Sequence, residues 1–156
     1  MVEPLKQRSD YDCFRTCVAM VTGYDYDVLP PITTVNWSSM FGSSTIRTAG
    51  DLRLAGGSVR DLSIKITSNG DILHGLPFTM VARIYRQFFG LRLKMWNRRP
   101  PVDGPCLMIS PEKAHVVVDV GNGLYIDPAI GWHQTDNPFA DDSPFSQIVW
   151  VTAWPV

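Results

Sequence analysis

Cys13, near the start of the chain, is the residue best suited to nucleophilic chemistry. The apolar stretch that follows predicts a helix from about Cys13 to Thr22, ended by Gly23. The unpaired N–H groups and the dipole at a helix N-terminus favour the thiolate form of such a cysteine. Asp10 and Asp12 oppose the thiolate unless they turn away as helix caps. We therefore expect a cationic partner for the sulfur.

The candidate base is His115, which opens a predicted strand over residues 115–120. The chain then turns near Gly121 and returns through a second predicted strand, 124–127. If the hairpin is centred on Gly121, His115 stands directly opposite Asp127. The same register gives the hairpin one uninterrupted apolar face, formed by Val116, Val118, Leu124 and Ile126.

A different turn would separate this pair. A two-residue turn at Asn122 and Gly123 offsets His115 from Asp127 by three residues, or about 10 Å at the usual strand rise. Asp119 is a poorer partner for the histidine, because four residues along one strand span roughly 13 Å. The alternation and the chemistry together favour the register that pairs His115 with Asp127.

A cysteine, a histidine and an orienting carboxylate form a Cys-His-Asp triad, which performs acyl transfer through a covalent thioester. Such a site also needs donors for the developing oxyanion. Gln7 lies on the segment that leads into the first predicted helix. Its side-chain amide, together with the Cys13 backbone N–H, could bind that oxyanion.

The order of these residues resembles that of the papain-like cysteine peptidase superfamily. Within it, the closest likeness is to the bacteriocin-processing (double-glycine leader) peptidases and the small bacterial and phage proteins related to them. The resemblance rests on Gln7, on Asp12-Cys13-Phe14-Arg15-Thr16-Cys17-Val18-Ala19-Met20, on Ala114-His115-Val116-Val117-Val118 and on Tyr125-Ile126-Asp127-Pro128-Ala129.

The resemblance implies an α+β papain-like fold, with Gln7 as oxyanion donor, Cys13 as nucleophile, and His115 and Asp127 on neighbouring strands. It covers both ends of the domain, and the region from about 24 to 101 shows no motif of the family. Phe14 departs from the family pattern, because a small residue is frequent after the cysteine. A phenylalanine there could narrow the cleft.

The elements that must position these residues define an α+β protein. Helical signals dominate the first half, where a second helix is expected over 77–89 and short helical turns over 37–57. Short β-rich segments dominate the second half and predict an antiparallel sheet, with the leading helix packed on it. The strands are expected at 91–96, 104–109, 115–120, 124–127 and 148–154. We expect one domain over residues 1–156.

Composition excludes several classes of protein. The formal net charge is -1, so no positive field is present to hold a nucleic acid. No apolar run approaches the roughly 20 residues that cross a bilayer, so we expect no membrane association, and without a secretory signal we expect a cytoplasmic protein. The three cysteines are an odd number and predict no disulfide framework.

The sequence favours a cysteine peptidase whose partner is a peptide or protein substrate. An acyltransferase using the same thioester, or a catalytically silent papain-like binding module acting as inhibitor or adaptor, are the alternatives. Cys17, one turn along the apolar helix face, and Cys106, in a strand, are predicted to be core residues. Zinc held by Cys13, Cys17 and a histidine is disfavoured because a second cysteine pair is missing, and we expect neither a metal nor an organic cofactor. The oligomeric state is not indicated.

Overall fold

The computed structural model describes residues 2–9, 12–30, 32, 35–36, 76–110, 115–134, 139 and 148–155. The predicted helical turns over 37–57 lie outside these residues. The elements are α1 (Cys13–Thr22), the 3-10 turn η1 (Tyr26–Val28), β1 (Val35–Asn36), β2 (Leu76–Pro77), α4 (Phe78–Phe89), β3 (Leu91–Trp96), β4 (Cys106–Ser110), β5 (His115–Gly121), β6 (Leu124–Asp127), β7 (Trp132–Gln134) and β8 (Val149–Pro155).

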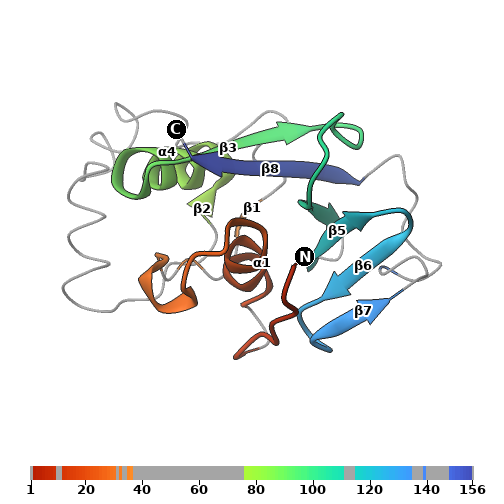
Figure 1. Cartoon of the computed structure of the whole chain (residues 1–156). Coiled ribbons are helices and arrows are strands. Elements are labelled where there is room, and N and C mark those ends of the chain that lie inside the picture. The colour runs from red at the N-terminus through yellow and green to blue at the C-terminus, as the bar shows by residue number, and fades with distance from the viewer. Residues whose placement is uncertain are drawn as a thin grey trace.

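The protein is α+β, as the sequence predicts. Six strands form an antiparallel sheet in the order β3-β8-β4-β5-β6-β7, while β1 and β2 pair separately in parallel. Figure 1 shows α4 beside β3, and α1 beside β5 nearer the other end of the sheet. An N-terminal helix packed on an antiparallel sheet is consistent with a papain-like arrangement.

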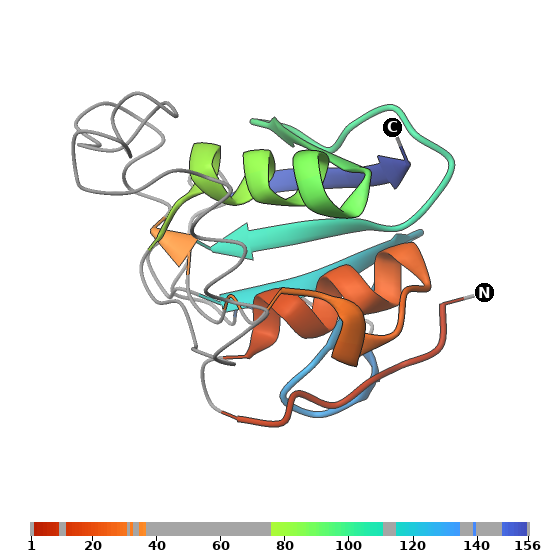
Figure 2. The same ribbon diagram turned by 90° about the vertical axis from the view of Figure 1, so that its left-hand side faces the viewer.

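Both helices cover the same face of the sheet, because they share one core with alternate residues of the strands. Figure 2 looks toward this face, with α4 and α1 in front of the strands. In β5, Val116 and Val118 belong to that core, whereas Val117 packs with Met108, Phe139 and Ile148 on the opposite face. The apolar face predicted for the hairpin is therefore confirmed for Val116, Val118 and Ile126. From α1 the buried core residues are Cys13, Phe14, Cys17, Val18, Ala19 and Met20.

Local signals explain where the helices begin and end. α1 ends at Gly23, whose φ of 75° is left-handed and whose N–H donates to the Ala19 carbonyl at 2.9 Å. Gly90 also has a positive φ and follows α4 directly. Among the described residues, neither helix has the length and hydropathy of a membrane span.

Candidate active site

Cys13 is the first residue of α1, where the helix dipole favours an anion, as predicted. Asp12 occupies the N-cap position, but its carboxylate makes no hydrogen bond to the backbone of the first turn. The capping role predicted for Asp12 is therefore wrong, and Asp10 lies outside the described residues. The Asp12 side chain instead accepts hydrogen bonds from the Arg8 N–H and from the hydroxyls of Thr16 and Tyr26.

The predicted register of the β5–β6 hairpin is also wrong. The chain makes the two-residue turn at Asn122 and Gly123, whose φ values of 58° and 75° are those of a type I′ turn. Gly121 consequently pairs with Leu124. A bulge between Asp119 and Gly121 then shifts the register by one residue.

The bulge brings the side chains of His115 and Asp127 back to the same face of the hairpin. Without it, the two-residue turn would put Asp127 on the same face as Val118, away from the histidine. With it, Val118 faces Ile126 and Asp119 faces Tyr125, so His115 and Asp127 share a face as diagonal neighbours. Histidine Nε2 lies 2.9 Å from Asp127 Oδ1.

The environment of His115 favours its charged form. Burial alone lowers its pKa, but the hydrogen bonds to Asp127 and to Cys13, with the charges of the same two residues, outweigh burial and raise the pKa to about 9. Since Nε2 faces Asp127, Nδ1 is the ring nitrogen left for the sulfur. The structure thus brings together Cys13, His115 and Asp127, from α1, β5 and β6.

Asp127 is held as the matching anion. Burial raises its pKa, but hydrogen bonds from His115 and from the Ala129 N–H outweigh burial and lower it. The Ala129 N–H donates to Oδ1 at 2.9 Å, from the turn that follows β6. The carboxylate is therefore ionised and fixed in orientation, as an acid that orients a histidine must be.

Phe139 packs against the histidine, a contact that no local sequence pattern predicts. Its ring meets the His115 ring edge to face, with centroids 6.1 Å apart, and it is buried against Met108 and Val117. The ring packs against His115, while the side chains of His115 and Asp127 remain 26% and 11% exposed.

Gln7 lies near Asp127 through its main chain. Its N–H donates to the carbonyl of Pro128, the residue after Asp127, at 2.7 Å. Its side-chain Nε2 donates to the Ser9 carbonyl at 2.8 Å, which uses one of the two amide hydrogens, and Oε1 is buried without a partner among the described residues. The role of Gln7 as oxyanion donor stays a prediction.

The other cysteines are core residues, as predicted. Cys17 is 0% exposed and its Sγ lies 3.4 Å from the Val116 carbonyl, and burial raises its pKa well above the usual value. Burial likewise raises the pKa of Cys106 to about 12. Phe14 does not narrow a cleft, because it is 1% exposed and packs edge-on against Tyr85 of α4.

The described residues form no metal-binding cluster at these side chains, and a surface pocket lies away from them. Within the described ranges, no group of three or more histidine, cysteine or acidic side chains is arranged to hold a metal. A surface pocket of about 860 Å³ lies at the other end of α1, around Met20, Gly23 and Pro105, and includes none of the four candidate residues. Cys13, His115 and Asp127 lie instead at the start of α1, at the start of β5 and at the end of β6. Comparisons with protein-family models, with curated proteins and with solved structures each gave no match.

Proposed function

We propose that this chain is a cysteine peptidase that cleaves a peptide or isopeptide bond through a thioester formed at Cys13. The observation that carries the proposal is His115, whose Nε2 lies 2.9 Å from Asp127 Oδ1 while the same ring bonds to Cys13. Because the pKa of His115 is raised to about 9, its ring is positively charged at neutral pH. A positive charge beside a helix N-terminus favours the thiolate of Cys13.

The reaction follows from these roles. The Cys13 thiolate attacks the substrate carbonyl carbon, forming the C–S bond, and the oxyanion accepts hydrogen bonds from the Cys13 N–H and the Gln7 amide. The imidazolium of His115 gives its Nδ1 proton to the leaving amine as the C–N bond breaks. The neutral ring then takes a proton from water, whose oxygen attacks the thioester and releases the carboxylic acid and the thiolate.

The substrate on this proposal is a peptide or protein, with the cytoplasm as the proposed location. Capture of the same thioester by an amine would make the enzyme an acyltransferase, and only the acceptor differs. Hydrolysis is the primary proposal because it needs no acceptor site beyond the triad.

Incubation with a complex peptide library tests the proposal. The parent protein, Cys13→Ser and the matched control Cys17→Ser are compared by mass spectrometry of the products, with glycinamide added in parallel as an amine acceptor. We expect new carboxyl termini from the parent and from Cys17→Ser, and none from Cys13→Ser. Glycinamide adducts in place of free carboxyl termini would identify acyl transfer. Equal products from the parent and Cys13→Ser would contradict any chemistry at this sulfur.

A further inference from the structure

A buried carboxylate stands immediately before the nucleophile and takes no part in the proposed chemistry. Asp12 is 1% exposed, although acidic side chains are seldom buried without a specific partner. A negative charge beside Cys13 opposes formation of the thiolate, so the carboxylate carries an electrostatic cost for the nucleophile. A helix cap would justify that cost, but Asp12 makes no capping hydrogen bond.

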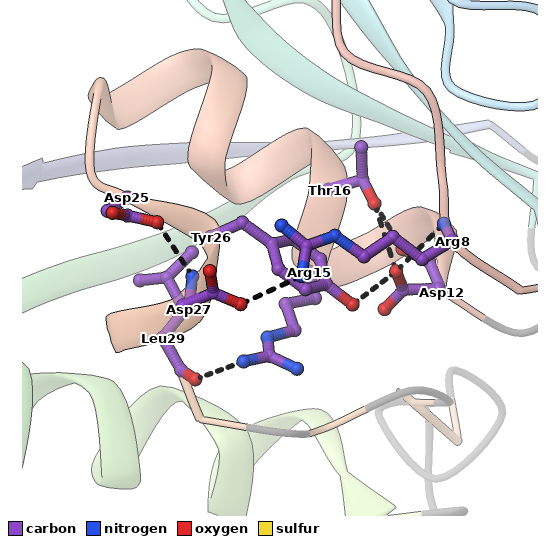
Figure 3. Close-up of polar contacts among 8 residues, drawn as sticks. All are labelled: Arg8, Asp12, Arg15, Thr16, Asp25, Tyr26, Asp27 and Leu29. Atoms are coloured by element: carbon purple, nitrogen blue, oxygen red, sulfur yellow. Dashed lines mark hydrogen bonds and ion pairs between the residues drawn. The ribbon is translucent and has the colours of Figure 1, made fainter.

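The Asp12 carboxylate instead joins three segments of the chain (Figure 3). Its Oδ2 accepts hydrogen bonds from the Arg8 N–H at 3.3 Å, from the Thr16 hydroxyl at 3.3 Å and from the Tyr26 hydroxyl. Arg8 belongs to the segment that approaches α1, Thr16 to the first turn of α1, and Tyr26 to η1. One oxygen therefore ties these segments together.

Tyr26 is itself held firmly in place. The guanidinium carbons of Arg8 and Arg15 each lie 4.0 Å from its ring centroid, which requires one cation on each face of the ring. Arg15 donates to the Leu29 carbonyl at 3.0 Å, and Arg8 forms an exposed ion pair with Asp27 at 2.8 Å. Burial and then the bond to Asp12 raise the pKa of Tyr26 to about 12, so its hydroxyl remains a donor at working pH.

The position of this oxygen matters because of its neighbours in the chain. Arg8 directly follows Gln7, the candidate oxyanion donor, in the sequence, and Asp12 directly precedes Cys13, the candidate nucleophile. We propose that the Tyr26–Asp12 pair is a positioning device, which fixes the spacing between the Gln7 amide and the Cys13 sulfur. This inference rests on the proposed function, since it assigns positions within that site.

Two probes of the same sulfur separate positioning from reactivity. Iodoacetamide alkylates a thiolate without forming an oxyanion, so it reports the Cys13–His115 pair alone. p-Nitrophenyl acetate acylates the thiolate, forming a C–S bond and releasing p-nitrophenolate, through a tetrahedral oxyanion that needs aligned donors. The rates of both reactions at Cys13 are followed by mass spectrometry.

The variants are Tyr26→Phe, which removes one hydroxyl and keeps the ring between its cations, and Gln7→Ala, which removes the candidate donor. Tyr24→Phe is the matched control, because that tyrosine is 38% exposed and lies outside the cluster. We expect Tyr26→Phe to slow acylation by about tenfold or more while alkylation is unchanged, because small misplacements of reacting groups cost large factors in rate. Gln7→Ala should show the same selectivity, and Tyr24→Phe no change.

Asp12→Asn provides a second variant should Tyr26→Phe fold poorly. It removes the charge that opposes the thiolate, so alkylation should not slow, whereas acylation should fall relative to alkylation. Equal changes in the two rates, or no change in either, would overturn the positioning role. Failure of the proposed function has a different signature: in the parent protein, Cys13 would then be alkylated no faster than Cys17, and His115→Ala would not matter.

Discussion

Exchanging Asp127 for asparagine removes the charge that sustains the positive form of His115. Histidine Nε2 and Asp127 Oδ1 are 2.9 Å apart, and the pKa of His115 is raised from 6.5 to about 9. That shift corresponds to about 3 kcal/mol in favour of the charged ring. Asp127 supplies the largest of the favourable contributions, so we expect Asp127→Asn to lower the pKa of His115 by about 1–2 units.

The sign of the effect on stability follows from the raised pKa. Because the folded chain holds the His115 proton more tightly than the unfolded chain, the stabilisation is fully present below pH 6.5 and is lost as the pH rises through about 9. The difference in unfolding free energy between the parent and Asp127→Asn should therefore narrow across this interval.

Two measurements check this prediction. The ring signals of the three histidines are followed by NMR against pH, with His115→Gln used to assign the signal, and urea unfolding is measured at the same pH values. Asp103→Asn is the matched control, since that carboxylate is exposed, and its curve should parallel that of the parent. An unchanged His115 pKa in Asp127→Asn, or a stability difference that stays constant with pH, would refute the reasoning.

Three further predictions concern the scaffold, and urea unfolding measures each of them. Phe14→Ala should cost about 3–5 kcal/mol because it empties a fully buried site between α1 and α4, and a loss below 1 kcal/mol would argue against that packing. Gly123→Ala should lower the free energy of unfolding by about 1 kcal/mol or more, because Gly123 has a positive φ that alanine adopts only with strain; no atom crowds the position. Asn122→Gly should be tolerated, because glycine accepts the positive φ at that position. Equal effects of the two substitutions would contradict the assigned turn. Asp119→Ala should cost about 2–3 kcal/mol, because that carboxylate bonds to a guanidinium, an indole N–H and the Gly121 N–H across the bulge, and an unaffected variant would show that the bulge needs no such support.

Local patterns in the sequence predict most of the helices and strands, because glycine stops and β-rich runs mark where these elements begin and end. Gly23 ends α1 by adopting a left-handed conformation that few other residues accept, and Gly90 marks the end of α4 in the same way. The long strands of the second half follow from β-rich runs between turn residues. β7 is not predicted, because Trp132–Gln134 is too short for a pattern and is defined by pairing with β6.

The hairpin register shows where sequence reasoning reaches its limit. Alternation determines which face each side chain occupies, so it fixes the register only to within an even number of residues. The predicted and observed registers differ by two residues. The prediction therefore places each side chain on the correct face of the hairpin but directly opposite the wrong residue of the other strand. The final register is set by a bulge between Asp119 and Gly121. Within it, Asp119 bonds to Arg99 and Trp150, which lie far away in the sequence.

Some parts of the candidate site could likewise be predicted from local sequence, and others could not. Cys13, His115 and Asp127 could be found from the sequence because each has a characteristic chemistry and a local structural context. The bonds of Asp12 to Tyr26, and the ring of Phe139 over His115, depend on tertiary packing that no local pattern encodes.

Alkylation of the three cysteines across a range of pH, measured for the parent and for His115→Ala, tests the central claim most directly. A reactive Cys13–His115 pair predicts rapid alkylation of Cys13 alone near neutral pH, and loss of that reactivity in His115→Ala. Cys17 and Cys106 should stay unreactive in the folded protein, since burial raises the pKa of both. Alkylation of Cys13 at the rate of the buried cysteines, or a rate indifferent to His115, would contradict the account.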